Sequence, residues 1–103
     1  MAPRVGPMSA YLIVDIDVHD MTTYDEYRKH VPAIVAKHGG SYLVRGGDPE
    51  TVEGEWKSTR LVVLRFPDRA AGKAFLEDPE YAPVKALRHA ASTSNGLLVD
   101  GVD

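Results

Sequence analysis

Alternating apolar and polar positions divide the sequence into strands and helices. In residues 10–18 (AYLIVDIDV) every even position is apolar, whereas the odd positions begin apolar and end with two aspartates. Because alternate side chains of a strand point to opposite faces, this stretch predicts a strand with one face in a core. Residues 60–66 (RLVVLRF) are apolar on both faces at their centre, which predicts a central strand. Residues 42–45 and 97–99 are the two other strand candidates.

Apolar residues recur at helical spacing after the first strand. A helix is expected to begin at Thr22 or Thr23, because Thr23 and Glu26 fit a capping box. Pro32 removes one backbone donor, which predicts a kink or two abutting helices. Gly39-Gly40 then ends the helix. The predicted buried stripe comprises Tyr24, Tyr27, Val31, Ile34, Val35 and His38.

Two further helices are predicted in the second half of the chain. Asp68 and Asp78 each stand where a side-chain oxygen can cap a helix start. Pro79 suits the first turn of the second of these helices. Gly46-Gly47-Asp48-Pro49 is a turn signal, and residues 51–53 are compatible with a small extra hairpin.

The predicted order is strand, helix, strand, strand, helix, strand. This is the α+β, ferredoxin-like βαββαβ pattern, with an antiparallel four-stranded sheet and helices on one face. The other face would carry Tyr11, Ile13, Leu61 and Val63 without cover. Because an apolar sheet face is rarely left in water, we expect a homodimer packed sheet to sheet.

Length and composition narrow the class of protein. The 103 residues predict a single domain over residues 8–103, after a flexible extension over residues 1–7 that lacks the apolar stretch of a signal peptide. The net charge is −3 without clustered Lys and Arg, so no nucleic-acid partner is expected, and no apolar run is long enough for a membrane span. The absence of cysteine excludes thiolate chemistry and is consistent with a cytoplasmic location.

Several motifs carry a family resemblance that covers residues 8 to 102. The most specific part is an Arg-Gly-Gly at Arg45 to Gly47 followed by Glu53-Gly54. The chain resembles the domain-of-unknown-function 1330 family, of the dimeric α/β-barrel superfamily. The other matching pieces are Ala10-Tyr11, Tyr24, Tyr27, Gly39-Gly40, Leu43-Val44, Trp56, Arg60, Phe66-Pro67, the Ala71 to Phe75 region, Pro79-Glu80-Tyr81, Arg88 and Val99-Asp100-Gly101.

The resemblance implies a fold and leaves the activity open. Superfamily neighbours include cofactor-free monooxygenases, lactone isomerases, dehydratases and haem-handling enzymes. Such a range is fold-level analogy and does not select a reaction. Membership of this family by itself implies no activity.

His30, Arg45 and Arg60 are the candidate catalytic residues. Arg45, beside two glycines, is either an anion clamp or an ordinary edge-strand arginine before a turn. His30 precedes Pro32 and is either a general base in an opened cleft or an exposed helix histidine. Arg60 is expected to approach Asp17 and form an ion pair with it. Alternatively, Arg60 stabilises an oxyanion of the ligand.

Glu53, Trp56, Tyr81 and Arg88 are the candidate ligand-binding residues. Trp56 either walls a pocket or plugs one end of the core. Glu53 is either a base or an ion-pair partner of Arg45 or Arg60.

The sequence therefore predicts a small-molecule-binding protein or a cofactor-independent enzyme. Its pocket is expected between sheet and helices, for an anionic or oxygenated organic ligand. No cofactor and no metal site are expected, since the four histidines show no metal-ligand spacing. The alternative is a non-catalytic structural or regulatory homodimer. A haem or metal handler is the weaker third hypothesis.

Overall fold

The computed structural model describes residues 8–103, and the predicted extension at residues 1–7 lies outside the described residues. The described residues form one antiparallel four-stranded sheet in the order β2-β3-β1-β4, and three helices. The α+β, ferredoxin-like arrangement predicted from the sequence is confirmed. In chain order the elements are β1 (Ala10–Val18), α1 (Met21–Lys37), β2 (Ser41–Gly46), β3 (Leu61–Phe66), α2 (Arg69–Glu77), α3 (Tyr81–Ala91) and β4 (Ser92–Asp100).

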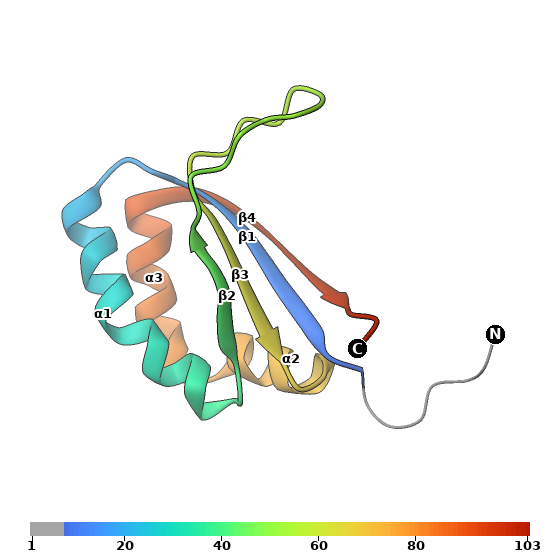
Figure 1. Ribbon diagram of the computed structural model, residues 1–103. Helices are drawn as coiled ribbons and strands as arrows, with labels where there is room; N and C mark the ends of the chain where they lie inside the picture. The colour runs from blue at the N-terminus through green and yellow to red at the C-terminus, as the bar shows by residue number, and fades with distance from the viewer. Residues whose placement is uncertain (1–7) are drawn as a thin grey trace.

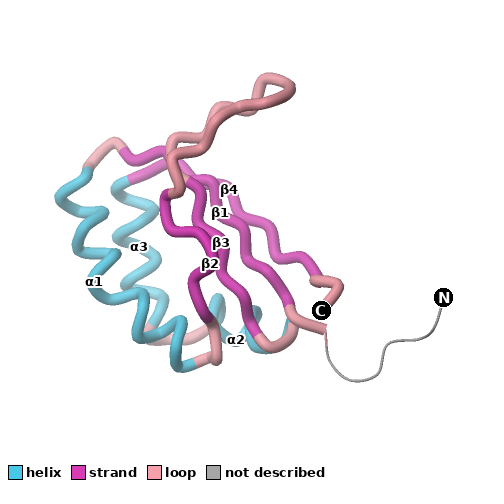
Figure 2. The backbone as a smooth tube through the Cα atoms, in the orientation of Figure 1, coloured by secondary structure: helices cyan, strands magenta, loops and turns pink. Residues whose placement is uncertain are grey.

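The helices lie on one face of the sheet, and no element of residues 8–103 covers the opposite face (Figures 1 and 2). Even-numbered residues of β1 such as Leu12 and Ile16 point into the core beneath the helices, as alternation predicts. They pack with Phe66, Phe75 and Tyr81 in one apolar cluster. The three aromatic rings form a chain, with centroid distances of 5.4 Å from Phe66 to Phe75 and 4.3 Å from Phe75 to Tyr81.

The uncovered face carries a row of apolar side chains. Ile13 lies opposite Val63 on one side and Leu97 on the other. In the neighbouring row, Tyr11 lies opposite Val99. Leu97 and Val99 are exposed in the single chain, so this face presents unburied apolar surface. We call Tyr11, Ile13, Val63, Leu97 and Val99 together the bare-face row.

The predicted start of α1 is wrong, and one of the two outcomes predicted for Pro32 does not occur. The cap is Asp20, whose carboxylate accepts from the Thr23 backbone N–H at 3.2 Å and from its hydroxyl at 2.7 Å, so the helix starts before Thr23. Pro32 lies inside one uninterrupted helix, so the expected break into two helices does not occur. Packing of Val31, Ile34 and Val35 on both sides of the proline holds the helix on the sheet.

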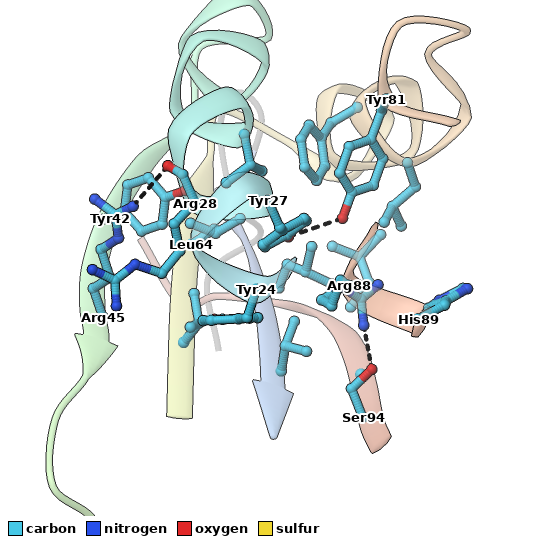
Figure 3. Close-up of a pocket in the computed structure, with 18 residues that line it drawn as sticks. Tyr24, Tyr27, Arg28, Tyr42, Arg45, Leu64, Tyr81, Arg88, His89 and Ser94 are labelled. Carbon is cyan, nitrogen blue, oxygen red and sulfur yellow. Dashed lines mark hydrogen bonds between the residues drawn. The ribbon is translucent and has the colours of Figure 1, made fainter. Parts of the chain in front are cut away.

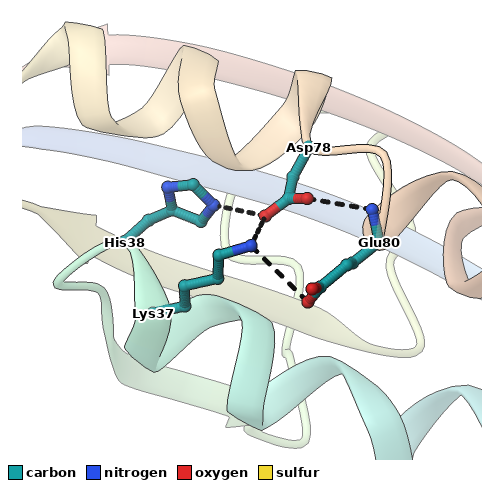
Figure 4. A network of polar contacts seen from close by, with 4 residues as sticks. All are labelled: Lys37, His38, Asp78 and Glu80. Carbon is teal, nitrogen blue, oxygen red and sulfur yellow. Dashed lines mark hydrogen bonds and ion pairs between the residues drawn. The ribbon is translucent and has the colours of Figure 1, made fainter.

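A polar network joins the end of α1 to the junction of α2 and α3 (Figure 4). The carboxylate of Asp78 accepts from Lys37 at 2.8 Å, from His38 at 2.7 Å and from the backbone N–H of Glu80 at 2.9 Å. The side chain of Asp78 is only 4% exposed, so these donors replace its water. The network therefore anchors all three helices on the same face.

Both ends of the described chain meet at one corner of the sheet. The Ser9 backbone N–H donates to the Asp103 carbonyl at 3.0 Å, and the Gly101 N–H donates to the Ser9 carbonyl at 2.7 Å. At the opposite end of the sheet, residues 47–60 leave β2 as a long arm before β3 (Figure 1). The structure assigns no strand within this arm, so the small hairpin expected at residues 51–53 is absent.

Candidate functional site

A cavity of about 270 Å³ lies between the sheet and the helices, and all three helices contribute lining residues to it. Its floor is apolar and includes Leu12 and Val62, whereas its polar lining comes from tyrosines, arginines, one histidine and one serine (Figure 3). We call it the tyrosine–arginine pocket, after the seven residues Tyr24, Tyr27, Arg28, Tyr42, Arg45, Tyr81 and Arg88.

The four tyrosines of the pocket remain largely shielded from water. Burial raises the pKa of Tyr24 and Tyr42 above its usual range, although nearby arginines work against this. Burial and the neighbouring Tyr81 raise the pKa of Tyr27 more strongly. The hydroxyl groups of Tyr27 and Tyr81 lie 3.2 Å apart within hydrogen-bond reach. The phenols of Tyr24, Tyr27 and Tyr42 therefore stay neutral near pH 7 and can both donate and accept hydrogen bonds.

A β-bulge turns Arg45 toward the pocket. Tyr42 lies opposite Leu64, but Val44 lies opposite Val63, so Leu43 is an extra residue in β2. The shift places Tyr42 and Arg45 on the same face of the sheet, three positions apart. The Arg45 guanidinium lies 4.8 Å from the centre of the Tyr42 ring and donates to the Arg28 carbonyl at 3.2 Å. Arg45 thus stands at the mouth between β2 and α1.

Arg88 lies at the other end of the pocket. Its guanidinium lies 5.9 Å from the Tyr27 ring centre and donates to the hydroxyl of Ser94 on β4 (Figure 3). His89, the next residue of α3, lines the rim with its ring directed away from the tyrosines. Partial burial, together with the charges of Arg88 and Lys85, lowers the pKa of His89. A neutral imidazole is therefore its main form near pH 7.

The pocket has a positive electrostatic bias. Three guanidinium groups line it, and none of its lining residues, all within the described chain, is Asp or Glu. The nearest acidic partner of a lining arginine is Asp25, which lies 3.9 Å from Arg28 and is exposed. Guanidinium groups pair with carboxylate, phosphate or enolate oxygens in a fixed planar geometry. The site can therefore hold the oxygens of a small anion against aromatic walls.

The structure brings together three of the seven predicted site residues. Arg45, Tyr81 and Arg88 all line the pocket. Arg60 lies just behind its wall, where its guanidinium stands 5.2 Å from the centre of the Tyr24 ring. Gly46 leaves room for Arg60 there, since a Cβ at that glycine would lie 3.3 Å from the guanidinium. Among the described residues Arg60 forms no ion pair with Asp17, because it points to the helix side.

The three other predicted residues lie elsewhere. The side chain of His30 is 58% exposed on α1, with Glu26 as its nearest acidic neighbour at 3.9 Å. Glu53 and Trp56 line a separate hollow of about 250 Å³ that is formed by the arm and Leu61. Trp56 is 62% exposed and donates to the Asp15 carboxylate at 3.0 Å, so it does not plug the core. Within residues 8–103, Glu53 has no ion-pair partner of the kind the sequence suggested.

Sequence reasoning missed the roles of Arg28, His89 and Ser94. Arg28 follows Tyr24 by one helical turn, and this spacing places both residues on neighbouring parts of one helix face. His89 and Ser94 carried no comparable signal, because their position depends on how α3 meets β4. In the described part of the chain, no group of three His, Cys, Asp or Glu side chains is arranged to hold a metal ion, and no helix there is long and apolar enough to span a membrane.

Comparison with solved structures supports the fold. A protein of unknown function from Rhodopseudomonas palustris matches with a TM-score of 0.80 and 14% identity, over 95% of this chain and 85% of the other. The cofactor-independent oxygenase SnoaB from Streptomyces nogalater matches with a TM-score of 0.64 and 18% identity, over 93% and 95%. A dimeric ferredoxin-like protein of unknown function from Thermobifida fusca matches with a TM-score of 0.55 and 12% identity, over 92% of each chain.

Comparison of the sequence itself identifies the family. No curated protein matches the chain. The family described as "Domain of unknown function (DUF1330)" matches residues 9–102, which is nearly the whole of the chain. The resemblance seen in the Arg-Gly-Gly and Glu-Gly motifs is thereby confirmed, and the chain belongs to the DUF1330 family.

Proposed function

We propose that this protein binds a small anionic or oxygenated organic molecule in the tyrosine–arginine pocket. The observation that carries the proposal is the lining itself: three guanidinium groups and four tyrosines surround a cavity without a carboxylate. A neutral or cationic ligand would leave those guanidinium groups unpaired when it displaced water, which disfavours it. An anion would instead form charge-assisted hydrogen bonds.

The cavity limits the size of the ligand. Its volume of about 270 Å³ lies just below the roughly 300–1,000 Å³ typical of small-molecule sites. A nucleotide or a polymer is therefore disfavoured, whereas a single ring or a short acyl chain with one acidic group is suitable. The rings of Tyr24 and Tyr27 stack at 5.6 Å and offer a flat wall to such a ring.

Cofactor-independent catalysis is the second candidate function. The likeness of the fold to SnoaB favours it, since that protein is a cofactor-independent oxygenase on a similar scaffold. In a catalytic pocket Arg45 would stabilise an oxyanion and neutral His89 would be the available base. A base must reach the proton that it removes, and the His89 ring points away from the tyrosines. Ligand binding is therefore the function that the geometry supports best.

The proposal includes a homodimer joined through the uncovered sheet face. The bare-face row supports it, because an apolar strip of this kind is normally buried. The dimeric protein from Thermobifida fusca, of similar fold, is a further argument. A structural or regulatory homodimer without a ligand is the alternative, and it would need only this face and not the pocket.

Titration by NMR tests ligand binding directly. We would add salicylate, 4-hydroxybenzoate and succinate to ¹⁵N-labelled protein, with 2-hydroxybenzyl alcohol as the uncharged counterpart of salicylate. We expect saturable shifts at amides around the pocket for at least one anion, and weaker shifts for the alcohol. Absence of saturable shifts with all three anions would contradict the proposal and favour the structural homodimer.

Matched variants localise the binding. Arg45→Gln and Arg88→Gln each remove one guanidinium from the pocket, and each should weaken anion binding by roughly tenfold or more, as for hydrogen bonds to charged groups. Arg69→Gln is the control, because Arg69 pairs with Asp100 at 3.0 Å and does not line the pocket. Equal effects of all three variants would indicate a nonspecific charge effect.

A further inference from the structure

Pro32 creates an unusual backbone group in the middle of α1. In a regular helix the N–H of each residue donates to the carbonyl four residues earlier. Proline has no N–H, so the carbonyl of Arg28 cannot receive its regular partner. The Arg28 carbonyl is therefore free to accept from another donor, either water or a side chain that can reach it.

Arg45 provides that donor from a different element. Its Nη2 donates to the Arg28 carbonyl oxygen at 3.2 Å, across the gap between β2 and α1 (Figure 3). The same guanidinium rests 4.8 Å from the Tyr42 ring centre. A guanidinium carries five N–H groups, so the two contacts fix its position and leave donors for a ligand.

We propose that Pro32 is a positioning residue, which holds the Arg45 guanidinium at the pocket mouth by leaving the Arg28 carbonyl free to accept from it. The anionic group of the ligand then binds at the β2–α1 end of the pocket. Pro32 itself does not line the cavity. The ligand part of this inference rests on the proposed function, whereas the link between Pro32 and Arg45 stands on the hydrogen bond alone.

The inference predicts opposite effects on stability and binding. Pro32→Ala restores an N–H that competes with Arg45 for the Arg28 carbonyl, so Arg45 loses its anchor. Because proline inside a helix is strongly unfavourable, the same change should raise the melting temperature. A residue with only a structural role would not combine a more stable fold with weaker binding.

Pro83→Ala is the matched control. Pro83 stands in the first turn of α3, whose N–H groups have no partner within the helix. The N–H that Pro83→Ala introduces therefore competes for no carbonyl within the helix and displaces no side chain. We would compare both variants by thermal unfolding, by salicylate titration, and by ¹⁵N NMR of the arginine side chains with the Arg45 signal assigned through Arg45→Lys.

We expect Pro32→Ala to have a higher melting temperature than the wild type and to show faster rotation of the Arg45 guanidinium. It should bind salicylate roughly two- to tenfold more weakly, which corresponds to the loss of one hydrogen bond. Pro83→Ala should leave binding and the Arg45 signal unchanged. In the Arg45→Gln background, Pro32→Ala should have no further effect on binding, because it acts through Arg45.

Two results would overturn the inference. One is an Arg45 signal that is identical in wild type and Pro32→Ala; the other is a lower melting temperature for that variant. If the wild type binds none of the anions, the ligand part fails together with the proposed function, but the Arg45 signal still decides the Pro32 link. If anions bind and Pro32→Ala changes neither affinity nor signal, the inference alone fails.

Discussion

The two faces of the sheet are built from the same strands, but they differ in whether helices cover them. On the helix face, Leu12, Val62 and Leu64 lie beneath helices that also enclose the tyrosine–arginine pocket. On the other face, no helix of residues 8–103 lies above Ile13 and Val63. Alternation along β1 and β3 supplies apolar side chains to both faces, but the connections of this fold place all three helices on one.

Because of this difference, we expect the helix face to control the folding stability of the chain and the other face to control its dimerisation. The helix face is completed within one chain, so it should determine whether the chain folds. No element of residues 8–103 covers the bare-face row, so in the proposed homodimer this row should determine whether folded chains pair. Changes on one face should therefore leave the property of the other face largely intact.

The largest expected effect lies on the helix face. Phe75→Ala should lower the free energy of unfolding by about 3–5 kcal/mol, because it leaves a cavity between Phe66 and Tyr81. Urea denaturation at low protein concentration measures this change. Leu97→Ala is the contrast, since Leu97 is 69% exposed and its loss should change the stability of the single chain little. If Phe75→Ala and Leu97→Ala lowered the free energy of unfolding equally, the proposed distinction between the two faces would be wrong.

An acidic substitution on the bare-face row should break pairing. Ile13→Asp places a charge at the centre of the proposed interface and should weaken dimerisation by about 3 kcal/mol or more, roughly a hundredfold or more in the dissociation constant. Sedimentation velocity over a dilution series would show it. Ala33→Asp, on the exposed side of α1, is the control. A wild type that sediments as a monomer would refute the sheet-to-sheet dimer.

Acid should weaken the helix face through Asp78. Lys37 first, and then His38, hold the pKa of this carboxyl well below its usual range. A lowered folded-state pKa stabilises the fold above the unfolded value of about 3.9, and this contribution is lost as pH falls from there toward the folded value. Denaturation at several pH values from 7 to 3 should show stability falling at the acid end. Asp78→Asn should have a lower free energy of unfolding than the wild type at pH 7, and should lose less of it on acidification. Asp100→Asn is the control and should show neither effect.

The smallest effect is expected on the arm beside the bare-face row. Trp56→Phe removes the indole hydrogen bond to Asp15, but Trp56 is mostly exposed. The free energy of unfolding should fall by about 1 kcal/mol or less in a urea titration. A loss of several kcal/mol would instead restore the interpretation of Trp56 as a core plug.

The fold followed from the sequence because its signals are local and repeated. Alternation in β1 and β3 identified both faces of the sheet, and Asp68 caps α2 as predicted by accepting from the Ala71 N–H at 2.8 Å. The error at the start of α1 arose where two caps compete, since Asp20 and Thr23 both offer a side-chain oxygen. Only the geometry of the turn after β1 decides between them.

The site was less predictable because it depends on irregular features. Strict alternation would place Tyr42 and Arg45 on opposite faces, and only the bulge at Leu43 brings them together. His30 lies close to Pro32 in sequence, but helical rotation carries its side chain to the solvent side. The proline matters through the Arg28 carbonyl, an atom that no side-chain pattern represents.

The paired ends of the described chain have a consequence for engineering. Ser9 exchanges backbone hydrogen bonds with Gly101 and Asp103, so the path of residues 8–103 is nearly a closed ring. A short linker joining these residues, with new termini cut into the arm at residues 47–60, should give a circular permutant that folds. Its new termini would leave every strand pairing of the sheet intact, and they would provide an attachment point beside the uncovered face.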